Sequence, residues 1–141
     1  MWEAMISELC PEATFENGAT VDQIRAAGEA LGTEFPDQLV SLLLESNGVD
    51  GEYGHGLVWP VERIVADNLL FRTSADFLEL YMPFDPLLFF ADAGNGDQFA
   101  FPTIPRKDEV FVWDHESDSR MWAAQDLRQY IRRWMDGTLK V

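Results

Sequence analysis

The sequence has few of the residues on which most catalytic and metal sites depend. Its 141 residues include one cysteine, Cys10, and two histidines, His55 and His115. A single cysteine excludes an internal disulfide and a zinc site built from several thiolates, and it suits a reducing compartment. Two histidines leave little material for base-assisted catalysis, because histidine is the commonest general base in enzymes.

Long apolar runs are also missing. No uninterrupted apolar segment approaches the ~20 residues that span a bilayer. The first residues, Met1–Met5, lack the basic region with which a signal peptide begins. We therefore expect a cytoplasmic protein that does not insert into membranes.

Basic residues are scarce: 10 Lys and Arg stand against 25 Asp and Glu, a net charge of -15. Residues 1–62 hold twelve of the acids and one base, whereas residues 63–141 hold thirteen acids and nine bases. Such a surface repels phosphate backbones and anionic lipids, so direct binding to nucleic acid or to a membrane is disfavoured. It attracts a basic protein. The alternative interpretation is that the acidity serves only solubility.

Apolar material is plentiful, with 47% hydrophobic and 13% aromatic residues. This is enough to offset the conformational entropy that folding removes, so disorder is not expected. The length fits one domain over residues 1–141.

The amino-terminal half predicts mainly helices. Thr20 and Gln23 form a capping box, and Gly32 suits the end of that helix; its apolar stripe is Val21, Ile24, Ala27 and Leu31. Residues 36–48 predict a second helix that begins at a proline and ends at Asn-Gly. After a short β-prone segment at 57–59, a third helical stripe contains Val61, Ile64, Val65 and Leu69. Residues 72–86 carry no clear pattern.

From residue 86 the period changes to that of strands. Residues 87–91 and 98–101 predict a hairpin around Gly94–Gly96, and residues 110–113 and 120–123 predict a second antiparallel pair. The closing helix has its apolar face at Leu127, Tyr130, Ile131, Trp134 and Met135, and Gly137 ends it. Together these elements predict an α+β fold in which a central, mostly antiparallel sheet is flanked by helices.

A search for chemistry finds no site. Neither histidine lies in a catalytic motif, and Cys10 lies at the end of a short helix with no histidine partner indicated; a small hydrolase that uses His55 or His115 stays open as a minor hypothesis. Acids in the two turns lack the spacing of a calcium loop and suit turn chemistry: Asp92, Asp97, Asp114, Glu116 and Asp118. We expect no catalytic residue, no metal and no cofactor.

Most large aromatic residues fall on faces that the periodicity places in the core, among them Phe89, Phe99, Trp113 and Trp134. Trp2 and Trp59 are open to two interpretations. Core packing is the favoured one, and the alternative is an anchor for a partner protein.

Several landmarks in order resemble the SMI1/KNR4 family, also called SUKH, over about residues 20–139. They are the segment Leu31–Leu39 with its Phe35-Pro36, the helix end Ser46–Gly48, the turn Gly94–Asp97, and the segment Val110–Glu116. Family members often carry Leu-Pro where this chain has Phe-Pro, which is a small departure. No single landmark is specific, but the series is distinctive.

The resemblance implies an α+β fold and a role without catalysis. Many bacterial members of this family are immunity proteins, which bind a toxin domain, often a nuclease, and block its active site. A fungal branch regulates cell-wall synthesis and signalling instead.

The leading hypothesis is therefore an immunity protein that neutralises a basic toxin domain, and the alternative is a regulatory scaffold unrelated to toxins. The acidic loop and the two turns are the expected contact residues, namely Asp50, Glu52, Tyr53 and His55, followed by Asp97, Asp114 and Glu116. The sequence leaves open the identity of the toxin and the oligomeric state.

Overall fold

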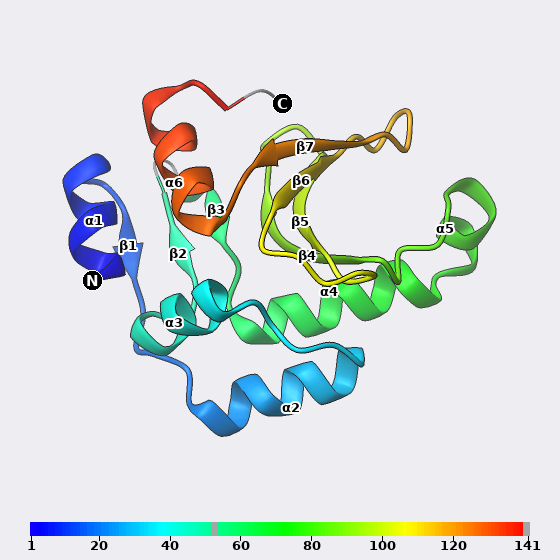
Figure 1. Cartoon of the computed structure of the whole chain (residues 1–141), viewed down its shortest axis with the longest axis horizontal. Coiled ribbons are helices and arrows are strands. Elements are labelled where there is room, and N and C mark those ends of the chain that lie inside the picture. The colour runs from blue at the N-terminus through cyan, green and yellow to red at the C-terminus, as the bar shows by residue number, and fades with distance from the viewer. Residues whose placement is uncertain (52–53, 140–141) are drawn as a thin grey trace.

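The computed structural model describes residues 1–51 and 54–139 (Figure 1). Two of the expected contact residues, Glu52 and Tyr53, lie outside the described residues. The helices in this part of the chain are α1 (Trp2–Leu9), α2 (Val21–Leu31), α3 (Asp37–Glu45), α4 (Val61–Thr73), α5 (Ala75–Leu80) and α6 (Leu127–Asp136). The strands are β1 (Thr14–Phe15), β2 (Val49–Asp50), β3 (Gly56–Val58), β4 (Leu87–Asp92), β5 (Gln98–Pro102), β6 (Val110–Trp113) and β7 (Arg120–Ala124).

The described strands form two antiparallel sheets. In the first, β2 lies between β1 and β3, and in the second β4, β5, β6 and β7 follow one another in chain order. A main-chain hydrogen bond of 2.8 Å from Trp59 to the carbonyl of Phe90 connects the end of β3 to β4. The predicted α+β class with antiparallel strands and flanking helices is confirmed. The first sheet was not predicted, because β1 and β2 have only two residues each and show no alternation.

The helix signals in the sequence are confirmed. Thr20 and Gln23 form both hydrogen bonds of a capping box, and Gly32 ends α2 in the left-handed conformation at φ 68°. Gly137 ends α6 in the same way at φ 77°. One detail of the α2 stripe is wrong: Val21 is 56% exposed, because it is the first residue of the helix and the core begins at Ile24.

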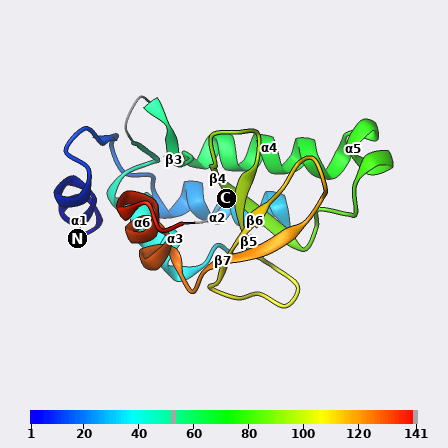
Figure 2. The ribbon, with the colours of Figure 1, turned by 90° about the horizontal axis from the view of Figure 1, so that it is seen from above.

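Helices α4 and α6 pack against the four-stranded sheet, as the views from two directions show (Figures 1 and 2). Phe71 of α4 contacts Phe89 of β4 and Trp113 of β6, with ring centroids 4.9 and 6.0 Å apart. Tyr130 of α6 contacts Phe90 and Phe99, at 5.2 and 4.8 Å. The sheet therefore buries aromatic residues against helices from both the middle and the end of the chain.

The α4 stripe differs from the prediction by one position. Leu69 is 39% exposed, and its neighbour Asn68 is buried at 1%. The side-chain amide of Asn68 donates to the Phe89 carbonyl at 2.9 Å, and its oxygen accepts the Phe89 N–H at 2.8 Å. A polar side chain thus fastens α4 to β4 where the sequence predicted an apolar contact.

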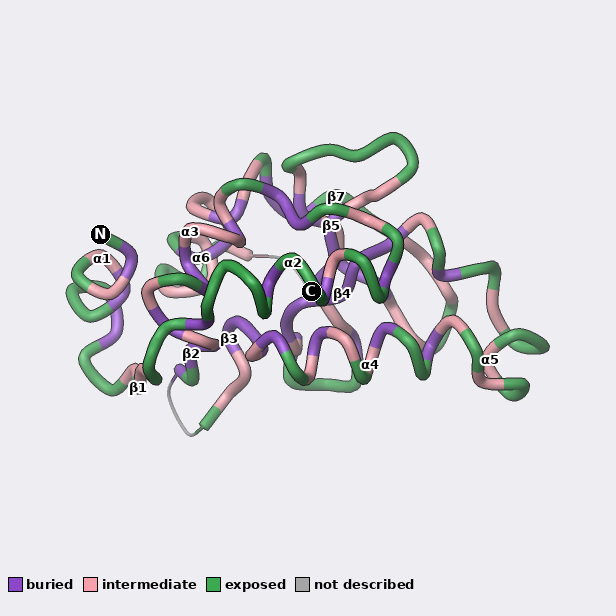
Figure 3. Tube along the Cα trace, turned by 90° about the horizontal axis from the view of Figure 1, so that it is seen from below, coloured by how far each residue is buried: buried purple, intermediate pink, exposed green. Residues whose placement is uncertain are grey.

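The tryptophans open to two interpretations lie in the core. Trp2 and Trp59 are 2% and 1% exposed, so core packing, the favoured interpretation, is confirmed. The predicted core residues Phe89, Phe99 and Trp113 are buried, and Trp134 packs against the core from its edge. Figure 3 shows burial concentrated in the strands and on the inner faces of the helices, whereas α5 has no buried residue.

Within the described residues, no helix has both the length and the apolar character that crossing a membrane requires.

Candidate binding surface

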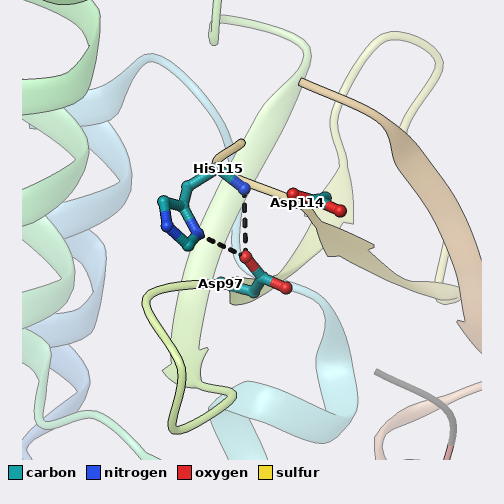
Figure 4. A group of neighbouring side chains, drawn as sticks. All are labelled: Asp97, Asp114 and His115. Carbon is teal, nitrogen blue, oxygen red and sulfur yellow. Dashed lines mark hydrogen bonds and ion pairs between the residues drawn. The ribbon is translucent and has the colours of Figure 1, made fainter. Parts of the chain in front are cut away.

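Asp97 and His115 join the two turns that the sequence indicated as contact sites (Figure 4). One carboxylate oxygen of Asp97, Oδ1, accepts the main-chain N–H of His115 at 3.0 Å and lies 2.6 Å from the ring atom Nδ1. Gly96 has φ 94°, and a Cβ on it would lie 2.9 Å from the His115 ring, so glycine is needed for this approach. Asp97 is 7% exposed, so its carboxylate bonds mainly to groups of this chain.

The pKa values of the pair shift in opposite directions. The hydrogen bond with Asp97 raises the pKa of His115 above its ordinary 6.5. Burial alone would raise the pKa of Asp97, but the hydrogen bonds from the main chain and ring of His115 outweigh it and lower that pKa below 3.8. Each partner thus favours the charged form of the other.

Asp114 is occupied by its own turn. Its Oδ1 accepts the main-chain N–H groups of Glu116 at 2.8 Å and Ser117 at 3.3 Å. Asp97, Asp114 and His115 place one possible metal-ligand atom each within 4.8 Å of one another. A cation there would compete with the hydrogen bonds that both carboxylates already make, so we assign the group to holding the two turns together. Glu116 is exposed and remains open to a partner.

Asp118 fastens the same turn to the segment before β4. Its carboxylate accepts the main-chain N–H of Met82 at 2.9 Å and the indole N–H of Trp113 at 2.8 Å, and it pairs with Arg120 at 3.2 Å. The Tyr81 hydroxyl donates to the carbonyl of His115 at 2.9 Å. The β6–β7 turn is therefore held in place from two sides.

His55 packs as an aromatic ring. It stacks on Trp134 of α6 with centroids 4.5 Å apart and planes 9° apart, and Gly94 of the β4–β5 turn lies beside it. Burial lowers the pKa of His55 below 6.5, against the opposing effects of Asp92 and Asp50. This site favours the neutral ring, which packs the loop before β3 against α6 and lies beside the β4–β5 turn.

Asp50 lies on a groove of about 450 Å³ beside β2. Among the described residues that line it, three carry a carboxylate and none carries a positive charge; these residues are Thr14, Glu16, Asn17, Asn47, Gly48, Val49, Asp50, Pro60 and Glu62. Because Glu16, Asp50 and Glu62 are all exposed, their charges face solvent. We call this feature the acidic groove.

Asn47 and Gly48 shape one wall of the acidic groove. The Asn47 side chain accepts the main-chain N–H of Val61 at 2.8 Å and donates to Glu62 at 3.1 Å. Gly48 has φ 95°, and a Cβ there would lie 2.8 Å from the Pro60 nitrogen. These contacts position Glu62 at the start of α4 across from β2.

The nearest base in the sequence does not offset the groove. Arg63 makes a bidentate ion pair with Asp92, with distances of 2.9 and 3.0 Å, and a second ion pair with Asp67 at 3.1 Å. Its guanidinium also lies 4.1 Å from the centroid of the Trp59 ring. Its charge is thus balanced by two carboxylates other than those of the groove. A second, larger groove of about 620 Å³ between α2 and α3 includes Arg25 among its lining residues, so its charge is mixed.

Sequence reasoning found Asp50 but missed its neighbours Glu16 and Glu62. They lie far apart in the chain, and their approach depends on the pairing of β1, β2 and β3, which the sequence did not show. The available signal was only the high density of acids in residues 1–62.

A family profile described as SMI1-KNR4 cell-wall matches residues 21–131. The chain belongs to the SMI1-KNR4 family, also called SUKH. No curated protein matches it. Two SUKH landmarks now have a structural role in this chain: Asn47–Gly48 shapes the acidic groove, and the turn that ends at Asp97 holds His115.

Proposed function

We propose that this SUKH protein is a cytoplasmic immunity protein that binds and neutralises a cognate basic toxin domain, with a nuclease as the favoured class. The observation that carries the proposal is the acidic groove, where three carboxylates face solvent and no lining residue offsets them. The protein acts by binding and needs no catalytic residue or cofactor.

Charge explains why a nuclease is favoured. A nuclease keeps a positive surface to hold phosphates, so an acidic inhibitor covers the same surface by replacing the charge of the substrate. Electrostatic steering brings association toward ~10⁸–10⁹ M⁻¹s⁻¹ at low salt. Fast capture suits a protein that must bind a toxin before damage accumulates.

The test uses the toxin domain encoded beside the gene of this protein. Co-expression of the two should keep cells alive, and the purified proteins should form a complex at low salt. Continued killing together with no complex would overturn the proposal.

A charge-reversal pair locates the contact. Glu16→Lys combined with Asp50→Lys should raise the Kd by roughly tenfold or more, because both carboxylates line the groove. Asp76→Lys combined with Glu79→Lys changes the net charge equally on exposed positions of α5 and is the matched control. Equal effects of the two pairs would show that general charge, and not the groove, attracts the partner.

The second candidate is a regulatory scaffold unrelated to toxins, in which the acidity serves solubility. The cell-wall description of the matching family favours it. Binding to an identified partner that is insensitive to ionic strength, with no protection against a toxin, would support this candidate over the first.

A further inference from the structure

Strand β7 forms an edge of the four-stranded sheet, because its sheet neighbour among the described residues is β6 alone. Figure 2 shows β7 on the side of the sheet away from α4. In an antiparallel pair every second residue turns its N–H and C=O away from the neighbouring strand. The main-chain N–H of Asp114 donates to the Ser119 carbonyl at 2.9 Å, so the main-chain groups of Ser119 point toward β6. Counting along the strand from Ser119, the main-chain groups of Arg120 and Trp122 point away from β6.

Two large apolar side chains lie on this edge. Met121 is 63% exposed and Trp122 is 50% exposed. The Arg133 guanidinium lies 5.7 Å from the Trp122 ring centroid, and it also donates to the Ala123 carbonyl at 2.7 Å, so the ring is supported from α6. Tryptophan and an open strand edge are both features of protein-binding surfaces.

The edge lacks a charged residue that guards it, and the register shift after Trp122 limits the regular edge to residues 120–122. Natural edge strands are guarded by lysine, proline or inward-pointing charges. The one charged residue of β7, Arg120, is turned to Asp118 and to the main-chain carbonyls of Met82 and Pro83, at 3.2, 2.9 and 3.0 Å. Its charge is therefore not available to repel an incoming strand.

The charge around the edge favours a basic occupant. Residues 107–126, which contain β6 and β7, hold six acids and two bases, and Arg133 of α6 adds a third base beside Trp122. Both bases pair within this segment, Lys107 with Glu109 at 3.8 Å and Arg120 with Asp118 at 3.2 Å. A second copy of the chain would bring the same negative charge to the edge, whereas a basic segment is attracted.

A series of contacts runs through the molecule from the acidic groove to the turn before β7. Asp50 of the groove pairs with Gly56, His55 lies beside Gly94, and the β4–β5 turn binds His115 at the start of the turn that leads into β7. A standard interface uses about 20–30 residues a side. Nine of the described residues line the groove, so a partner held there needs further surface.

We propose that an extended segment of the basic partner pairs with the outer edge of β7 and packs on Trp122 and Met121. This inference rests on the proposed function and adds to it a strand-pairing mode of binding. In this mode, main-chain hydrogen bonds supply affinity, and contacts with the two exposed side chains determine which partner side chains fit.

The experiment uses the full chain and an inactive form of the toxin domain encoded by the neighbouring gene. Hydrogen exchange of the complex should show the Trp122 amide protected relative to the free protein, because strand pairing engages outward N–H groups. Trp122→Ala should raise the Kd roughly thirtyfold. The matched control is Leu70→Ala on α4, 55% exposed, which should change the Kd by less than about twofold.

The outcomes separate the two proposals. No complex with the wild-type chain overturns the proposed function. A complex that is weakened by groove charge reversal, but in which Trp122→Ala binds normally and the Trp122 amide stays unprotected, overturns the edge pairing alone. If Trp122→Ala instead dissociates a dimer of the free protein at low salt, the occupant is a second copy and the inference is wrong.

Discussion

At the scale of single residues, the structure divides the expected contact residues by their hydrogen bonds. Asp97 and Asp114 accept N–H groups of the two turns, and His55 stacks on Trp134, whereas Asp50 and Glu116 stay exposed. Sequence shows where acids lie in turns but not which way each carboxylate faces, because both directions suit a turn. Exposed acids are thus the stronger candidates for partner contact.

The Asp97–His115 pair makes a pH-dependent contribution to stability. The raised pKa of His115 stabilises the fold fully below pH 6.5, and this contribution is lost as the pH rises through the higher pKa of the folded state. The lowered pKa of Asp97 acts in the other direction: its contribution is present above 3.8 and is lost as the pH falls through the folded value. Both contributions to stability are present together between pH 3.8 and pH 6.5.

We therefore predict that His115→Ala lowers the melting temperature more at about pH 5.5 than at about pH 9. Thermal unfolding followed by circular dichroism at the two pH values measures this difference. Glu79→Ala on α5 is the control, since that side chain is exposed and should show little change at either pH. A loss that is equal at both pH values would mean that the ion pair does not contribute.

At the scale of elements, the periodic helices and the hairpins of the carboxyl-terminal half were predictable, and the short elements were not. Capping and turn residues marked α2, α6 and the β4–β5 turn, because local hydrogen bonds decide them. Strands β1 and β2 have two residues each and depend on distant partners. Helix α5 has no buried residue, so residues 72–86 gave no stripe to recognise.

Asn68 gives the sharpest test at this scale. Asn68→Ala should reduce the free energy of unfolding by about 2–4 kcal/mol, because it leaves the buried N–H and C=O of Phe89 without partners. Leu69→Ala, the neighbour that the sequence pattern assigned to the core, should cost less than about 1 kcal/mol because the side chain is partly exposed. Urea unfolding of the two variants measures both values. The reverse order would contradict the assignment of Asn68 as the residue that fastens α4 to β4.

At the scale of the whole molecule, composition gave the net negative charge, and the structure shows where on the surface part of that charge lies. The amino-terminal half holds most of the net negative charge, and Glu16, Asp50 and Glu62 from that half line one groove. Arg63 near the groove and Arg120 of β7 are engaged in ion pairs, whereas Arg133 beside Trp122 bonds to main-chain carbonyls. The exposed acids therefore face solvent with few competing positive charges nearby.

If these acids recruit a basic protein, its binding depends on ionic strength. Binding of the wild-type chain to an inactive form of the proposed toxin partner should be measured by calorimetry and stopped-flow at about 50 and about 300 mM salt. We predict that the Kd rises by roughly tenfold or more and that most of this change lies in the association rate, because salt screens steering between exposed charges. A Kd and an association rate that stay the same at both salt concentrations would show that the exposed acids do not recruit the partner.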